Sequence, residues 1–225
     1  QAISDYQQAR YGARRMVLSA AGRLEHERLV ELAEASFGAH RSDSDAAQTP
    51  PRYQGGERRY DRDLEQLHLL LGFDGVGIED PDYYSGQVFS TLFGGGMSSR
   101  LFQEVREKRG LVYSVFSFLN GQSDSGLFGL YAGTGEAEAG ELLQIFCEEL
   151  GKVATAPVGE AELQRAKAQL KASVLMSRER TSARAEALGG GILAHGRPIP
   201  PEETVARIEA VEPADHPNAR REDDC

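Results

Sequence analysis

Hydrophobic and polar residues alternate in two parts of the chain, and this pattern predicts β-strands. The first part is residues 64–73, whose odd-numbered positions are expected to share one face. The second part begins at Tyr113, which we place on the same face as Val115 and Ser117. Both stretches therefore predict strands.

The remaining apolar periodicity predicts a hairpin and a set of helices. Turn-forming residues at 120–126 precede an apolar run at 127–132, which is expected to be the return strand of the hairpin. Gly133–Gly135 reads as a turn, and a second triple glycine at 189–191 as a helix break. Apolar spacing of three or four positions predicts helices, over residues 81–92, 136–154, 160–188 and 204–211. The apolar stripe of the third helix is expected to pack on a sheet.

The first 56 residues follow a different pattern. Residues 15–22 are expected to form a buried strand, and residues 29–37 a helix. One strand and one helix cannot bury their own apolar faces, so we expect them to pack on another domain. Residues 39–56 are rich in Ser, Asp, Pro, Gln and Gly without any period, which predicts a linker.

The most specific stretch runs from Phe93 to Val115. Gly94–Gly96 lack Cβ atoms, so this loop is expected to take positive φ and to let another chain approach closely. A short helix should follow, with Ser98 or Ser99 as its N-cap and Gly110 at its end in the left-handed conformation. Its apolar face is expected to consist of Leu101, Phe102 and Val105.

This loop, helix and strand would place Arg106 and Tyr113 near the same loop. A guanidinium and a phenol can both donate hydrogen bonds to the carbonyls of an extended peptide. The residues alone favour a simpler interpretation, in which turn glycines precede a surface helix, Arg106 is solvated and Tyr113 is packed.

Composition excludes several classes of protein. A net charge of −10 and a pI of about 5.1 argue against a nucleic-acid partner and are compatible with basic peptides. The two cysteines are too few for a disulfide framework, and Cys147 is expected to be a buried structural thiol. A reducing compartment follows, the cytoplasm or alternatively the mitochondrial matrix. No apolar run is long enough to span a bilayer, and residues 1–10 lack a secretory pattern.

The stretch GGGMSSRLFQEVREKRGLVYSV resembles the signature of the C-terminal half-domain of the insulinase and mitochondrial-processing-peptidase family. These are zinc metallopeptidases with an inverted H-x-x-E-H motif, and the similarity extends from about Tyr11 to about Val211. The resemblance implies an α+β fold, a mostly antiparallel sheet backed by long helices, which forms one half of a clamshell. It also implies that Arg106 and Tyr113 orient the substrate and support the oxyanion. Substrate contact is implied for Gly94, Gly95, Gly96, Met97 and Ser98.

The same resemblance implies a domain layout. Residues 1–38 correspond to the tail of the N-terminal, zinc-bearing half, and residues 39–56 to the linker between the halves. Residues 57–211 correspond to the C-terminal, substrate-clamping half-domain. Residues 212–225 depart from the family pattern, and truncation, a frame change and true divergence stay open as explanations.

The chain lacks the family's zinc motif. None of its five histidines stands in H-x-x-E-H, so no metal ligand is expected here and zinc is expected in the intact protein or a partner. His68 is expected to be a hydrogen-bonded strand histidine.

We therefore interpret the chain as the non-metal, substrate-binding half of a zinc metalloendopeptidase, inactive by itself. Its expected partners are a peptide substrate and a zinc-bearing half or partner subunit, and a dimer is compatible with the resemblance. The alternative is a non-catalytic peptide-binding or assembly subunit, and a third possibility is a remnant that does not fold.

Overall fold

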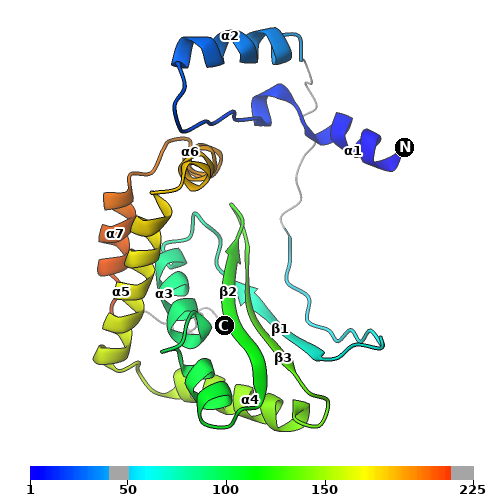
Figure 1. Cartoon of the computed structure of the whole chain (residues 1–225), viewed down its shortest axis with the longest axis vertical. Helices are drawn as coiled ribbons and strands as arrows, with labels where there is room; N and C mark the ends of the chain where they lie inside the picture. Colours follow the sequence, from blue (N-terminus) through cyan, green and yellow to red (C-terminus); the bar gives the residue numbers. More distant parts are fainter. Residues whose placement is uncertain (41–50, 214–225) are drawn as a thin grey trace. The chain divides into compact units, whose positions relative to one another are not determined.

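The computed structural model describes residues 1–40 and 51–213, which belong to two compact units (Figure 1). The described residues of one unit fall within Gln1–Pro50 and Leu175–Pro200. Those of the other fall within Pro51–Val174 and Pro201–Cys225. The glycine-rich stretch and both candidate side chains lie in the second unit.

A three-stranded antiparallel sheet forms the centre of the second unit. Its strands are β1 (Leu67–Gly75), β2 (Val112–Gly121) and β3 (Gly126–Thr134), in the order β1-β3-β2. The hairpin of β2 and β3 confirms the prediction from the turn residues, and the alternation along β1 is also confirmed. The prediction of a turn at Gly133–Gly135 is wrong, because Gly133 and Thr134 still pair with β1.

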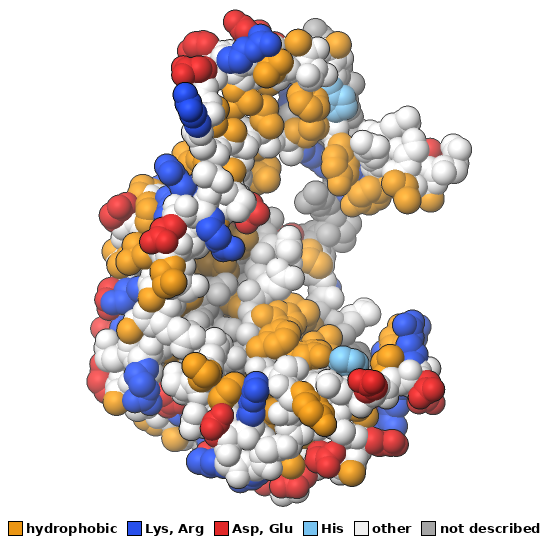
Figure 2. Space-filling view, viewed as in Figure 1, with side chains coloured by type: hydrophobic (Ala, Val, Ile, Leu, Met, Phe, Trp, Pro, Cys, Tyr) orange, Lys and Arg blue, Asp and Glu red, His pale blue; other side chains and the backbone are white. Residues whose placement is uncertain are grey.

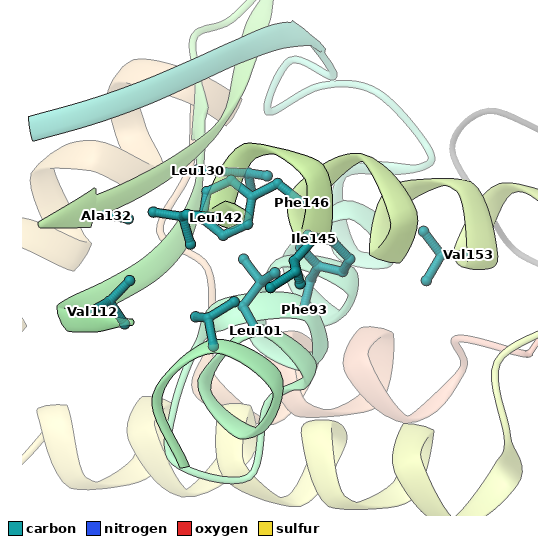
Figure 3. Close-up of a cluster of buried hydrophobic side chains, with 10 residues drawn as sticks. Phe93, Leu101, Val112, Leu130, Ala132, Leu142, Ile145, Phe146 and Val153 are labelled. Atoms are coloured by element: carbon teal, nitrogen blue, oxygen red, sulfur yellow. The ribbon is translucent and has the colours of Figure 1, made fainter. Parts of the chain in front are cut away.

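Helices cover one face of this sheet. Helices α3 (Tyr83–Gly94) and α4 (Ala139–Thr155) pack on it, and α3 begins two residues later than predicted. Figure 3 shows side chains from strands and helices converging in this core. Its buried members are Phe93, Leu101, Val105, Val112, Leu130, Ala132, Leu142, Ile145, Phe146 and Val153. Each large member contributes about 2 kcal/mol by leaving water.

The opposite side of α3 packs against α5 (Glu160–Ser177) and α7 (Pro201–Glu209). The buried residues of this second cluster are Val88, Leu92, Val158, Leu163, Ala166, Ile208 and Val211. The apolar stripe of α5 therefore packs on helices, and the prediction that it packs on a sheet is wrong. The physical reason is that α3 and α4 already occupy the covered face of the sheet.

The other face of the sheet carries exposed aromatic and aliphatic side chains. Phe116 stacks on Tyr131 with 4.7 Å between the ring centroids, and Leu70 is 63% exposed on the neighbouring strand. Figure 2 shows hydrophobic side chains gathered over these strands. His68 Nδ1 lies 2.8 Å from the hydroxyl of Tyr131, which confirms the prediction of a hydrogen-bonded strand histidine.

The first unit is helical in its described residues. It contains α1 (Ala2–Arg10), the 3₁₀ turn η1 (Ala13–Arg15), α2 (His26–Phe37) and α6 (Thr181–His195). The helix predicted over residues 29–37 is confirmed, whereas the strand predicted over residues 15–22 is wrong. A strand needs a neighbour for its backbone N–H and C=O groups, and no described strand pairs with this segment.

The helix predicted over residues 160–188 is two helices, since α5 ends at Ser177 and α6 begins at Thr181. The second triple glycine lies inside α6, so the predicted helix break is wrong. A Cβ on Gly189 would lie 2.8 Å from the Ser19 hydroxyl oxygen, which itself donates to the Ala185 carbonyl. Close packing of residue 19 on the helix therefore accounts for a glycine here.

Candidate functional site

The glycine run ends helix α3 and is packed by the chain itself. Gly94 is the last residue of α3, and Gly95 follows with φ −79° and ψ 0°. Positive φ among the described residues occurs only at Gly22, Gly110 and Gly196, so the positive φ predicted for Gly94–Gly96 is wrong. A Cβ on Gly94 would lie 2.5 Å from the backbone nitrogen of Ser117. The lack of a side chain here lets α3 approach β2.

Side chains hold the loop that follows. Gln169 Nε2 donates to the Gly95 carbonyl at 2.8 Å, and Gln103 Nε2 donates to the Met97 carbonyl at 2.7 Å. Met97 is 75% exposed and Ser98 is also exposed. The loop therefore exposes residues 97 and 98 to solvent, while the Gly95 and Met97 carbonyls accept hydrogen bonds from glutamine side chains.

A helical turn begins at Arg100 and continues into η2 (Phe102–Glu107), which is a π-helix. The Phe102 N–H donates to the Ser99 hydroxyl at 3.4 Å, so Ser99 makes the capping contact predicted for residue 98 or 99. The Lys108 N–H donates to the Gln103 carbonyl five residues earlier, as in a π-turn. Gly110 has φ +64°, which confirms the predicted left-handed end.

Arg106 differs from the other cations of this stretch. Arg100 donates two hydrogen bonds to the Glu162 carboxylate, and Lys108 and Arg109 both form ion pairs with Glu104. Arg106 is exposed, with its guanidinium 5.0 Å from the centroid of the Phe102 ring. Among residues 1–40 and 51–213, no carboxylate pairs with it. Its N–H groups therefore remain available to a ligand.

The carboxylate of Glu104 is fully engaged by its neighbours. Hydrogen bonds from Lys108 and then Arg109 lower its pKa, because they stabilise the charged form. Arg109 also donates to the Glu104 backbone carbonyl at 2.8 Å. This network keeps an acidic group on the same turn from neutralising Arg106.

Tyr113 lies at an irregularity in β2. The register with β3 shifts between Val112 and Ser114, so Tyr113 does not follow the alternation of side chains between the two faces of the sheet. Tyr113 is 66% exposed while Ser117 is buried, so the prediction that the two share a face is wrong. The simpler interpretation, in which Tyr113 is packed, is also wrong. The phenol is open to solvent.

Arg106 and Tyr113 flank one short hydrogen-bonded turn. The Gly110 N–H donates to the Arg106 carbonyl at 3.0 Å, and the Leu111 N–H donates to the Val105 carbonyl at 2.8 Å. Thr134 on β3 donates to the Leu111 carbonyl at 2.6 Å. The backbones that carry the guanidinium and the phenol are thus tied to each other and to the sheet.

The described residues offer no metal site, since no three His, Cys, Asp or Glu side chains group as ligands there. Cys147 is exposed, so the predicted buried thiol is wrong. Its neighbour Phe146 takes the core position on α4, and Cys147 lies one step off that apolar stripe. In the part of the chain that is described, no helix has both the length and the apolarity to cross a membrane.

Sequence reasoning missed the residues that support the loop. Phe102 and Arg106 are four positions apart, a spacing that places two side chains together on a helix and could have indicated their contact. Gln103 is in the same stretch but carries no distinctive signal. Gln169 contacts the loop across 74 residues of sequence, and nothing local indicates it.

Comparison with known proteins identifies relatives over most of the chain. The sequence profile of the Peptidase M16 inactive domain matches residues 1–170. An uncharacterized zinc protease of Rickettsia felis is 39% identical over 206 residues, covering 91% of this chain and 50% of the relative. An uncharacterized zinc protease of Streptomyces coelicolor is 36% identical over 222 residues, covering 95% of this chain and 48% of the relative. The chain spans about half the length of these relatives.

Solved structures share the fold. A chain of complex III2 from Candida albicans matches with a TM-score of 0.75 and 23% identity, covering 86% of this chain and 48% of that one. A peptidase M16 inactive domain from Pseudomonas fluorescens matches with a TM-score of 0.70 and 22% identity, covering 86% and 47%. At these identities the likeness shows the fold alone, and it confirms the predicted α+β architecture.

Proposed function

This chain belongs to the M16 peptidase (insulinase) family through its inactive domain, and on that premise we propose that it is the substrate-clamping half of a zinc peptidase. Arg106 and Tyr113 hold the substrate peptide in this proposal. Zinc and the general base come from another half of the protein or from a partner.

The observation that carries the proposal is the state of Arg106. The other cations of residues 100–109 are paired with carboxylates, whereas Arg106 is exposed without one among the described residues. A guanidinium has five N–H donors in a planar fork, which suits peptide carbonyls. An exposed cation without a carboxylate partner can donate to the carbonyls of a peptide.

Tyr113 supports the same role. Its side chain is 66% exposed, and Leu111, two residues before it, is hydrogen-bonded to the Val105 carbonyl. The hydroxyl can donate one hydrogen bond to a substrate carbonyl or to the oxyanion that develops as the peptide is attacked. Met97 and Ser98 are exposed in the glycine loop and would contact the peptide.

The test is a chimera in which this chain follows the part of the Rickettsia felis relative that it does not cover. With zinc present, we expect hydrolysis of a fluorogenic peptide. Arg106→Ala and Tyr113→Phe should each lower kcat/KM by about 100-fold, the loss of about 3 kcal/mol typical of an oxyanion donor. Unchanged kcat/KM in both variants would refute the assignment.

Arg58→Ala is the matched control for Arg106→Ala. Arg58 also lies over an aromatic ring, with its guanidinium 5.9 Å from the centroid of Tyr60, but it is outside the glycine-rich stretch. The control should keep the parental kcat/KM. A loss equal to that of Arg106→Ala would mean that removing any surface cation weakens hydrolysis.

The second candidate function is an assembly subunit that cleaves nothing. The likeness of fold to a chain of complex III2 and the family's description as an inactive domain support it. In that case the chain should bind a zinc-bearing half stably in analytical ultracentrifugation, and the Arg106→Ala and Tyr113→Phe variants should bind equally well. A chimera that assembles but never hydrolyses peptides would favour this candidate over the first.

A further inference from the structure

We infer that Phe102 is a positioning residue for Arg106, holding the guanidinium by its face so that its N–H edge stays free for a peptide. The inference rests on the proposed function for its biological meaning. The contact itself is a property of the chain and can be tested separately.

The geometry places the two side chains together. Phe102 and Arg106 are four residues apart on η2, and the guanidinium carbon lies 5.0 Å from the ring centroid. That distance is within the range of a cation–π interaction. Leu101 and Val105 on the same turn are fully buried in the core, so the backbone beneath the pair is anchored.

The backbone on the C-terminal side of Arg106 is also fixed. The Lys108 N–H donates to the Gln103 carbonyl at 3.1 Å, and the Gly110 N–H donates to the Arg106 carbonyl at 3.0 Å. Only the long side chain of Arg106 is left to be ordered. Phe102, which is half-buried, lies against its guanidinium.

The chemistry of the contact distinguishes it from an ion pair. A carboxylate would orient Arg106 by accepting hydrogen bonds from the donors that a substrate needs. An aromatic ring attracts the cation through the face of the ring and offers no carboxylate oxygen to accept these hydrogen bonds. The neighbouring carboxylate of Glu104 is engaged by Lys108 and Arg109. The turn thus orders Arg106 without consuming its donors.

Ordering the side chain before binding should improve affinity. Immobilising a rotamer-rich side chain on binding costs part of the interaction energy, and a ring that has already ordered it removes part of that cost. We expect Phe102→Leu to raise KM of the chimera by about 5-fold with little change in kcat, an order-of-magnitude estimate for one such side chain. Phe102→Tyr keeps a ring and should restore the parental KM.

The direct test is nuclear magnetic resonance of the full chain. The Arg106 Nε–Hε resonance, identified by its loss in Arg106→Lys, should carry a ring-current shift. Phe102→Leu should abolish that shift and Phe102→Tyr should retain it. Tyr60→Leu, which removes the ring beneath Arg58, is the control and should leave Arg106 unchanged.

The outcomes separate the inference from the proposed function. If Phe102→Leu leaves the Arg106 resonance unchanged in a chain with the parental circular dichroism spectrum, the positioning role is refuted. A KM effect of Phe102→Leu that persists in an Arg106→Ala background would also refute it, because the ring would then act independently of Arg106. If the shift is abolished as expected but Arg106→Ala hydrolyses peptides normally, the contact stands and the proposed function fails.

Discussion

The Gln169 side-chain amide donates a hydrogen bond of 2.8 Å to the Gly95 carbonyl, which joins helix α5 to the glycine loop. A second link from α5 is close by in sequence, since Glu162 accepts two hydrogen bonds from Arg100 at the other end of the loop. The loop is therefore held from one helix at both of its ends. The exposed residues between these links, Met97 and Ser98, are presented on a fixed backbone.

Gln169→Ala should loosen the glycine loop. The variant leaves the Gly95 carbonyl without this donor, and we expect a loss of about 1 kcal/mol in the free energy of unfolding. Hydrogen exchange at the Met97 and Ser98 amides should quicken as the loop opens more often. Gln164→Ala is the control, because Gln164 donates to Glu160 on the exposed side of the same helix. Equal exchange in the two variants would contradict the role of Gln169.

Glu162→Gln should cost more stability than breaking an exposed ion pair. The Arg100 and Glu162 side chains are each only 21% exposed, and hydrogen bonding to Glu162 raises the pKa of the Arg100 guanidinium. Losing one partner of this pair should cost about 2 kcal/mol in urea unfolding. Glu31→Gln breaks an ion pair in which both side chains are about two-thirds exposed, and it should cost less than about 0.5 kcal/mol. Similar losses in both variants would show that burial does not matter here.

The Glu104 network should make stability depend on acid pH. Because its pKa is lowered in the folded chain, Glu104 contributes stability that is present above its unfolded pKa of about 4.3. That contribution is lost as the pH falls through the lower, folded pKa. The Tm of the parent should therefore exceed that of Glu104→Gln at pH 6, and the difference should shrink below about pH 4. A Tm difference that stays constant over this range would contradict the pKa shift.

Gly94→Ala should destabilise the fold, although alanine is the better helix former. The added Cβ would lie 2.5 Å from the Ser117 backbone nitrogen, so α3 and β2 would have to separate. We expect a loss of about 2 kcal/mol, typical of overpacking in a core. Gly151→Ala in α4 is the matched control, since nothing lies within 4 Å of its new Cβ, and it should stabilise by up to about 1 kcal/mol. Two variants of equal stability would refute the close approach at Gly94.

Several features could be predicted from sequence because their causes are local. The alternation along β1, the hairpin of β2 and β3, and the left-handed Gly110 each depend on residues within a few positions of one another. His68 was predicted to be hydrogen-bonded from the absence of nearby ligands, and Tyr131 is its partner. The family signature around Arg106 was also readable, since it is one continuous stretch.

Other features could not be predicted because long-range packing decides them. The alternation predicted that Tyr113 and Ser117 share one face of the strand. The register shift against β3 instead leaves Tyr113 exposed to solvent. The glycines at 189–191 were predicted to break the helix, yet α6 continues through them, and Ser19 packs against it at Gly189. In each case the deciding neighbour is distant in sequence.

The sequence by itself determined the helical and strand periods, the α+β class and the family, since these depend on local spacing and on one continuous motif. Tertiary structure decided the pairing of Arg100, whereas Lys108 and Arg109 pair with Glu104 on their own turn. Arg106 differs from Arg100 only because α5 brings a carboxylate to Arg100, whereas the described residues bring none to Arg106. The energy of an ion pair depends on distance and burial, and for Arg100 and Glu162, which are 62 residues apart, both arise only when α5 packs beside the loop.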